Sequence, residues 1–372
     1  MNIQMVDLKG QYVRLKDEID AAIHEVLDSA RFIRGPVVSQ FENALTECTK
    51  AKYAIGVANG TDALQISYMA LDIGPGDEII TPSFTFIATA EAASLLGATP
   101  VFADIDPKTF CLDPDSVEQC ITPKTKAIVP VHLFGQPAEM DSLTKLASKY
   151  NLPIIEDNAQ AIGATYNGTS TGSMGTMACC SFFPSKNLGA YGDGGAILTS
   201  DPELETRSRM ITNHGGRHKY LNETIGVNSR LDALQAAILT VKLKHLESFT
   251  LARRSAASYY HSLFETIDEI TRPYETPEGF HVYHQYVIRT KKRDELADAL
   301  TNAKIPYGIY YPVPLHQQPV FQGDITPNIT LPETEKACEE VLALPMHTEL
   351  THAHQDRVAE IVIKHAKTLI YA

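Results

Sequence analysis

Short β-branched runs alternate with amphipathic stretches between about residues 50 and 200, and this alternation restricts the fold more than any other feature. We expect strands at Tyr53–Val57, Glu78–Thr81, Pro100–Asp104, Ala127–Val131, Pro153–Glu156, Ala178–Phe182 and Gly195–Thr199. Helical patterns cover 61–71, 85–96 and 139–150. This order predicts an α/β fold whose central sheet is mainly parallel, with helices on both faces. Ligands of such sheets bind beyond the carboxyl ends of the strands.

The pattern changes after Arg230. A long helical stretch follows, with an apolar face made by Leu231, Leu234, Ile238, Val241 and Leu246. The rest of the chain combines helices with strands that we expect at 282–289 and 307–311. We therefore predict a large domain over 1–244 and a smaller α+β domain over 245–372, which a chain of 372 residues can accommodate.

Composition excludes several classes of function. The formal charge of −13 argues against non-specific binding of nucleic acid, although basic residues could still gather locally around an anionic metabolite. The six cysteines show no metal-binding spacing, so we expect reduced thiols that fill the core and no metal site. The first residues resemble no export signal, and no convincing membrane span is present, so we expect a cytoplasmic protein.

Lys186 is the strongest candidate for catalysis. It lies among small, polar and glycine residues in Ser181-Phe-Phe-Pro-Ser-Lys186-Asn-Leu-Gly-Ala-Tyr-Gly-Asp-Gly-Gly195. An amine held beside the cationic atoms of a cofactor has a lowered pKa, and it can act as a Schiff-base nucleophile and proton shuttle. Ser181, at the end of a predicted strand, could bind a phosphate. The alternative is a surface lysine in a flexible glycine loop.

Asp157 ends another predicted apolar strand, in Ile154-Ile-Glu-Asp157-Asn-Ala-Gln160. A buried aspartate needs a cationic or hydrogen-bonding partner, and a protonated pyridine nitrogen would be one. Gln160 could donate to a phenolate oxygen on the same ring. The alternative is an aspartate that caps the next helix.

Residues 59–62 form the sequence Asn-Gly-Thr-Asp between the first predicted strand and its helix. The free N–H groups and the dipole of a helix N-terminus favour a phosphate at this point. Gly60 would let the backbone approach the ligand closely, and Thr61 adds a hydroxyl group. The same residues are also typical of an ordinary turn and helix cap.

Taken together, these motifs resemble the DegT/DnrJ/EryC1/StrS family of nucleotide-sugar aminotransferases. The similarity covers nearly the whole chain, and the motifs occur in the family's order. They are Asn59-Gly-Thr-Asp-Ala-Leu64, Glu156-Asp-Asn-Ala-Gln160, Ser181-Phe-Phe-Pro-Ser-Lys186, Gly192-Asp-Gly-Gly195 and Gly226-Val-Asn-Ser-Arg-Leu-Asp232. The resemblance implies a pyridoxal 5'-phosphate enzyme of fold type I, the aspartate aminotransferase fold.

The resemblance also implies a role for each matched residue. Lys186 would carry the cofactor, Asp157 would bind the pyridine nitrogen and Gln160 would lie beside the ring hydroxyl. The residues that would hold the phosphate or the ring are Gly60, Thr61, Ser181 and the stacking aromatic Phe86. Asn228 would reach the phosphate of a neighbouring subunit, which implies a homodimer with shared active sites. Glutamate would be the amino donor.

The subgroup that the chain most resembles aminates C3 of UDP-2-acetamido-2-deoxy-3-oxo-glucuronate for O-antigen and lipopolysaccharide synthesis. In that subgroup the counterpart of Arg230 is thought to meet the uronate carboxylate. Many relatives have His-Tyr-Pro where this chain has Tyr310-Tyr311-Pro312, so Tyr310 and Tyr311 are expected at the sugar and leave its identity open. A 3-keto or 4-keto dTDP-hexose is the alternative substrate. A non-catalytic regulator that binds the cofactor is a remote alternative.

Overall fold

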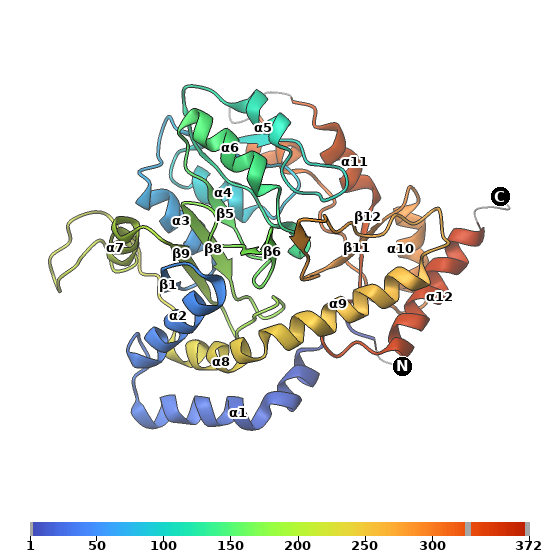
Figure 1. The fold of residues 1–372 in the computed structure, drawn as a ribbon, viewed down its shortest axis with the longest axis horizontal. Coiled ribbons are helices and arrows are strands. Elements are labelled where there is room, and N and C mark those ends of the chain that lie inside the picture. Colours follow the sequence, from blue (N-terminus) through green and yellow to red (C-terminus); the bar gives the residue numbers. More distant parts are fainter. Residues whose placement is uncertain (1–2, 324–328, 369–372) are drawn as a thin grey trace.

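A seven-stranded sheet forms the centre of the computed structural model, which describes residues 3–323 and 329–368 (Figure 1). The strands follow the order β3-β2-β4-β5-β8-β9-β1, and parallel bridges from Ile128 to Ile154 and from Val131 to Asp157 join the β4 and β5 segments. Their bounds are β1 Tyr53–Val57, β2 Glu78–Pro82, β3 Thr99–Ala103, β4 Thr125–Ile128, β5 Ile155–Asp157, β8 Met177–Ser181 and β9 Gly195–Thr199.

The expected mainly parallel sheet is confirmed, with one reversed strand. β9 runs antiparallel to both β8 and β1, whereas β2 pairs in parallel with β3 and β4, and β5 with β8. Strands β1, β5 and β8 therefore share a direction, and their carboxyl ends lie at one edge. Because β9 is reversed, its first residues return to that same edge.

Helices cover both faces of the sheet. Side chains of β8 alternate between the two cores, with Cys179 packed beneath α3 and Cys180 packed with α2 and α8, as expected for adjacent strand residues. All six cysteines are free. The helices of this part are α1 Leu8–Ser29, α2 Pro36–Thr49, α3 Gly60–Ala70, α4 Ala88–Ser94, α5 Pro114–Cys120, α6 Met140–Tyr150, α7 Pro202–Ile211 and α8 Ala233–Lys244.

The long helical stretch after Arg230 is two helices, because the chain breaks at His245 between α8 and α9. α9 (Leu246–Leu263) runs out from beneath the sheet toward a separate apolar core (Figure 1). That core is built mainly by residues between 256 and 366, and the domain boundary at 244/245 stays a prediction. The other elements of this part are β10 Gly279–Phe280, β11 Tyr286–Arg289, α10 Arg293–Asn302, α11 Pro332–Glu340, β12 Val341–Leu344 and α12 His352–Thr368.

Three expected elements differ clearly in the structure. The strand expected at 282–289 is limited to β11, Tyr286–Arg289. The strand expected at 307–311 is wrong, because only Gly308 pairs, through a single bridge to Ala343. The helix expected over 85–96 is shorter, since 84–87 form the turn that leads into α4. A small β10-β6-β7 sheet, with β6 Thr165–Tyr166 and β7 Thr169–Ser170, was not expected.

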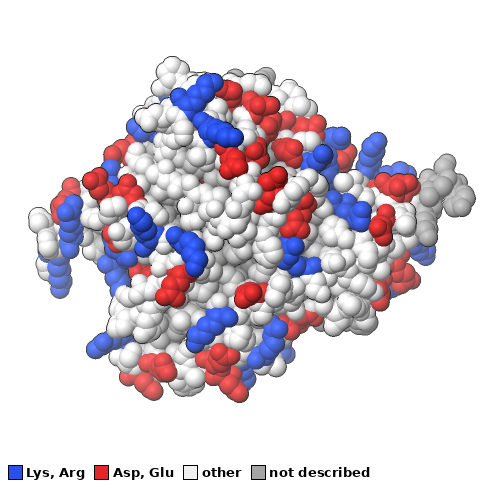
Figure 2. All heavy atoms as spheres, viewed as in Figure 1, with Lys and Arg blue, Asp and Glu red and all other residues white. Residues whose placement is uncertain are grey.

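The surface charges are mixed. Figure 2 shows acidic and basic side chains interspersed over the face that it presents, with no continuous basic area. Among the described helices, none combines the length and apolar character that crossing a membrane requires.

Candidate functional site

A cavity of about 850 Å³ opens at the carboxyl ends of β1, β5 and β8. This volume is in the range of pockets that hold small molecules and cofactors. Nine residues singled out from the sequence line it: Gly60, Thr61, Phe86, Asp157, Gln160, Ser181, Lys186, Tyr310 and Tyr311. The topology therefore brings together side chains that are up to 251 positions apart in the chain (60 to 311).

The N-terminus of α3 forms one wall of the cavity. Asn59 caps this helix, because its Oδ1 accepts the N–H of Asp62 at 2.8 Å and its carbonyl accepts the N–H of Ala63. The N–H groups of Gly60 and Thr61 have no hydrogen-bond partner in the described chain. Two free donors at a positive helix end make an anion site.

Gly60 also lies against the strand that carries Ser181. A Cβ atom at position 60 would be 2.8 Å from the Ser181 Cβ atom and 3.3 Å from its Oγ. Only glycine allows this close approach, which places the serine hydroxyl beside the helix end. The structure thus joins the two segments from which the sequence predicted a phosphate site.

Asp157 is 5% exposed at the end of β5. Its Oδ2 accepts the hydroxyl of Thr89 at 2.7 Å, and its Oδ1 accepts the N–H of Ala159 at 3.1 Å. The first bond joins β5 to α4, so the carboxylate is held by a neighbouring element and is not only a local cap. These two bonds leave the carboxylate able to accept a further hydrogen bond from a donor in the cavity, since a carboxylate has about four acceptor sites.

Lys186 lies in the loop between β8 and β9, and its N–H donates to the Phe183 carbonyl at 2.8 Å. Burial lowers the pKa of its amine to about 8, against the smaller opposing effect of Asp157. A bound cofactor, which was expected from the sequence to lower this pKa, is therefore not needed, because the protein environment alone already lowers it. A buried amine with this pKa is a competent nucleophile near neutral pH.

The aromatic side of the cavity is formed by Phe86, Tyr310 and Tyr311. Phe86 is 55% exposed at the mouth, and its ring centroid is 6.4 Å from that of Tyr311. Burial raises the pKa of Tyr311, and its hydroxyl accepts from Gln160 Nε2 at 3.2 Å. Gln160 Oε1 accepts the N–H of Phe134 at 2.8 Å, so the amide is oriented with one remaining N–H hydrogen.

Sequence reasoning missed one residue that lies behind the cavity, Thr89, and one that lines it, His284. Thr89 holds Asp157, as described above, and His284 is a buried lining residue whose Nδ1 is 3.2 Å from Asn187 Oδ1. Burial and the nearby Lys186 lower the pKa of His284, which keeps this imidazole neutral. The repeated histidines of His281-Val-Tyr-His284 were the one available signal, and nothing local distinguishes Thr89.

Glu156, one residue before Asp157, supports the site from behind. Its two carboxylate oxygens accept the N–H groups of Gly172, Met174 and Gly175 at 2.6–2.8 Å. His132 Nδ1 accepts the N–H of Ala138, so Nε2 carries the proton that it donates to Glu156 at 2.8 Å. These contacts fix the end of β5.

Two predicted residues lie elsewhere. Asn228 is exposed and bridges Asn213, and it does not line the cavity of its own chain. Arg230 lines a small separate hollow together with Arg34 and Arg209. Burial and the charges of Arg230 and Arg209 lower the pKa of Arg34. Neither residue contributes to the Lys186 cavity from within one chain.

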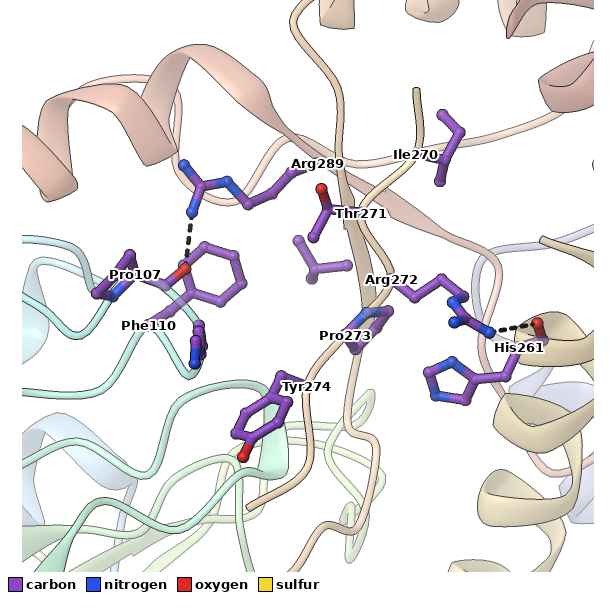
Figure 3. A pocket seen from close by; sticks show the side chains of 11 residues that line it. Pro107, Phe110, His261, Ile270, Thr271, Arg272, Pro273, Tyr274 and Arg289 are labelled. Carbon is purple, nitrogen blue, oxygen red and sulfur yellow. Dashed lines mark hydrogen bonds between the residues drawn. The ribbon is translucent and has the colours of Figure 1, made fainter. Parts of the chain in front are cut away.

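A second cleft, of about 530 Å³, lies between the 107–110 loop and the 270–274 segment. Figure 3 shows that its two arginines extend to opposite sides, with Arg289 donating to the Pro107 carbonyl and Arg272 to the His261 carbonyl. Arg289 is also paired with Glu340 at 2.8 Å. This cleft contains no convergent group of reactive side chains. In the described part of the chain, no cluster of side chains could hold a metal ion.

Comparison with known proteins gives a family match over most of the chain. The model of the DegT/DnrJ/EryC1/StrS aminotransferase family matches residues 13–363. A "Pleiotropic regulatory protein" from Geobacillus stearothermophilus is 50% identical, with 97% of each chain covered. UDP-2-acetamido-2-deoxy-3-oxo-D-glucuronate aminotransferase from Pseudomonas aeruginosa is 48% identical, covering 94% of this chain and 97% of the relative. A dTDP-3-amino-3,4,6-trideoxy-alpha-D-glucose transaminase from Streptomyces venezuelae is 44% identical, covering 97% and 95%.

Solved structures agree in fold. DesV of S. venezuelae in complex with a ketimine intermediate superposes with a TM-score of 0.95 at 44% identity, covering 98% of both chains. NtdA from Bacillus subtilis, with the bound cofactor PMP, superposes with a TM-score of 0.87 at 34% identity, covering 94% of this chain and 82% of that one. The expected fold type I is therefore confirmed.

Proposed function

Because this chain belongs to the DegT/DnrJ/EryC1/StrS aminotransferase family, we propose that it aminates C3 of UDP-2-acetamido-2-deoxy-3-oxo-glucuronate. It is a pyridoxal-phosphate-dependent transaminase that acts on nucleotide sugars. Glutamate is the proposed amino donor, and O-antigen or lipopolysaccharide synthesis is the proposed use of the product. The observation that supports a uronate is Arg230, which lines a hollow with Arg34 and with Arg209; Arg209 is paired with Glu42 at 3.1 Å, and Arg230 forms no ion pair within the described chain.

The Lys186 cavity fits the cofactor on its own geometry. A phosphate suits the two unpartnered N–H groups of α3 and the adjacent Ser181 hydroxyl. The buried Asp157 carboxylate has room for one further donor, which a protonated pyridine nitrogen supplies. The exposed ring of Phe86 offers a stacking surface at the mouth. These residues, with Gln160 and Lys186, are those we propose to hold the cofactor.

When bound, pyridoxal phosphate supplies an electron sink for the bonds at the substrate's amino-bearing carbon. We assign the proton transfers of the reaction to the Nζ atom of Lys186, because burial brings its pKa to about 8. The lowered pKa of His284 makes its imidazole a weaker base than this amine, and the amide of Gln160 is not a base near neutral pH. The Asp157 carboxylate would bind the protonated pyridine nitrogen and help to keep it charged.

The sugar is proposed to lie between the aromatic wall and residues from a second subunit. Asn228 and Arg230 do not reach the cavity of their own chain, which supports a homodimer in which they complete the partner's site. Arginine binds a carboxylate in a bidentate manner, so Arg230 suits a uronate better than a neutral hexose. Tyr310 and Tyr311 would contact the sugar from the same chain as Lys186.

The alternative substrate is a 3-keto or 4-keto dTDP-hexose, supported by the dTDP-sugar transaminase among the relatives. A neutral sugar would give Arg230 no carboxylate to bind. The Geobacillus relative is named a pleiotropic regulatory protein, which agrees with the other alternative, a non-catalytic regulator that binds the cofactor; nothing in the described cavity argues for it.

A reverse assay tests the proposal. The pyridoxal form is mixed with a panel of amino nucleotide sugars, and conversion of the cofactor is followed by its absorbance. We expect the UDP-3-amino uronate to react and Arg230→Ala to reduce its kcat/KM about 10- to 150-fold, as for the loss of a charged hydrogen bond of about 1.5–3 kcal/mol. Arg207→Ala, on the exposed face of α7, is the matched control. Equal losses on uronate and neutral sugars would overturn the carboxylate assignment.

A further inference from the structure

Lys242 is a buried lysine that the reaction described above does not use. It lies in the last turn of α8, and it is 1% exposed. Its Nζ atom donates to the carbonyl of Gly189 at 2.5 Å and lies 4.8 Å from the centroid of the Tyr191 ring. Both partners belong to the loop between β8 and β9 that carries Lys186.

No carboxylate forms an ion pair with Lys242 within the described residues. Burial alone lowers its pKa, to about 8. Removing an ammonium group from water without a carboxylate costs free energy, and one carbonyl and one aromatic ring recover only part of it. A methionine of similar length would fill the same space without that cost, so packing does not require a lysine at this position.

The loop depends on α8 at a second point. Gln235 Oε1 accepts the N–H of Tyr191 at 2.8 Å, and its Nε2 donates to the Tyr191 carbonyl at 3.4 Å. Gln235 and Lys242 are seven residues apart, two helical turns on one face. The loop is also tight, since a Cβ atom at Gly189 would be 2.2 Å from the Pro184 carbonyl oxygen. Backbone bonds to Phe182 and Phe183 and the bond from Asn187 to the Val282 carbonyl also hold the loop, and α8 adds the contacts to Gly189 and Tyr191.

We propose that Lys242 is a positioning residue, which fixes the Gly189 carbonyl and thereby the placement of the Lys186 amine in the cavity. The proposal rests on the assignment of Lys186 as the cofactor lysine. Helix α8 begins two residues after Leu231 and three after Arg230, so the same rigid helix links the proposed substrate arginine to the Lys186 loop. A shift of the loop by a fraction of an ångström would misplace the amine without unfolding the chain.

The test uses the cofactor-loaded enzyme and its half-reaction with glutamate, followed by the change in cofactor absorbance; kcat below is the rate constant of this half-reaction at saturating glutamate, and KM is the glutamate concentration that gives half of it. Lys242→Met removes the charge and the donor and keeps the volume. Lys242→Arg restores a charged donor. Lys244→Met, on the exposed side of the same helix end, is the matched control. Thermal unfolding of each cofactor-free variant is measured in parallel.

We expect Lys242→Met to lower kcat about tenfold or more, with KM for glutamate changed less than about threefold and with unchanged or increased thermal stability. Lys242→Arg should recover part of kcat, and Lys244→Met should match the wild type. A kcat for Lys242→Met within about twofold of the wild type overturns the proposal. Loss of stability in step with kcat, without recovery in Lys242→Arg, also overturns it and leaves a structural role.

The assignment of Lys186 is checked separately. Borohydride reduction of the wild-type protein followed by peptide mapping establishes whether Lys186 carries the cofactor before any Lys242 variant is compared. If Lys186 is unlabelled, the proposed function fails. If Lys186 is labelled and Lys242→Met reacts as fast as the wild type, only the positioning role fails.

Discussion

Gly60→Ala tests whether the N-terminus of α3 holds the cofactor phosphate. The added Cβ atom would be 2.8 Å from the Ser181 Cβ atom, whereas carbon atoms in contact are normally about 3.5–4.0 Å apart. The helix end or the serine must therefore move by about 0.7 Å. A hydrogen bond of about 2.9 Å that is stretched by this amount is no longer a hydrogen bond.

The expected loss follows from the number of donors affected. The N–H groups of Gly60 and Thr61 are unpartnered at the proposed phosphate site, and each charged hydrogen bond contributes about 1.5 kcal/mol. Loss of one or both weakens cofactor binding by about 1.5–3 kcal/mol, which is about a 10- to 150-fold increase in Kd.

The assay is an absorbance titration of the cofactor-free protein with pyridoxal phosphate. Gly74→Ala is the matched control, because a Cβ atom there meets only the Leu96 carbonyl oxygen at 3.9 Å. We expect the control to bind as the wild type does. A Gly60→Ala protein that is folded and binds the cofactor with unchanged Kd would refute the phosphate assignment.

Three further predictions concern the groups around the cavity. Thr89→Val should weaken cofactor binding about tenfold, because Asp157 loses the hydroxyl group that donates to it. Thr89→Ser keeps a hydroxyl group and should bind the cofactor as the wild type does. Equal cofactor affinities of the Val and Ser variants would contradict this prediction. In the cofactor-free protein, the rate of Lys186 acetylation should rise with pH and reach a plateau above the pKa of about 8, because only the neutral amine reacts. A midpoint of this rise near the ordinary lysine pKa of 10.5 would contradict the prediction. Glu156→Gln should lower the free energy of unfolding by about 2–4 kcal/mol in denaturant titrations, because its amide group would face N–H donors; a loss below about 0.5 kcal/mol would argue otherwise.

Much of the site was predictable because each part is a local feature at a strand end. The segments after β1, β5 and β8 each had a chemical signal in the sequence: a glycine turn before a helix, an aspartate and a lysine among glycines. Parallel strands then bring these segments to one edge. The order and direction of the strands, and not any single motif, bring these segments together around one cavity.

The reversal of β9 was missed, although a signal existed. No helical pattern occurs between Ser181 and Gly195, and a parallel strand would need a longer crossover connection, usually a helix. The strand expected at 307–311 is reduced to one bridge, in which Gly308 pairs with Ala343 on the edge of β12 that faces away from β11; nothing in the local sequence shows that the pairing stops there.

Other contacts could not be predicted from local sequence. Thr89 lies in an apolar helix, and only the packing of α4 against the end of β5 gives it Asp157 as a partner. From the sequence, Lys242 would be expected to be an ordinary exposed lysine at the end of a helix. It is buried because the loop between β8 and β9 packs over α8. Both depend on contacts between elements that are more than 50 residues apart.

The most direct test of the account is borohydride reduction of the purified, cofactor-loaded protein followed by mass spectrometry of its peptides. We predict that the reduced cofactor mass is attached to Lys186, and that Lys186→Ala abolishes the attachment while the chain remains folded. Attachment to another lysine, with Lys242 as the other buried amine whose pKa is about 8, would contradict the assignment on which the proposed chemistry depends.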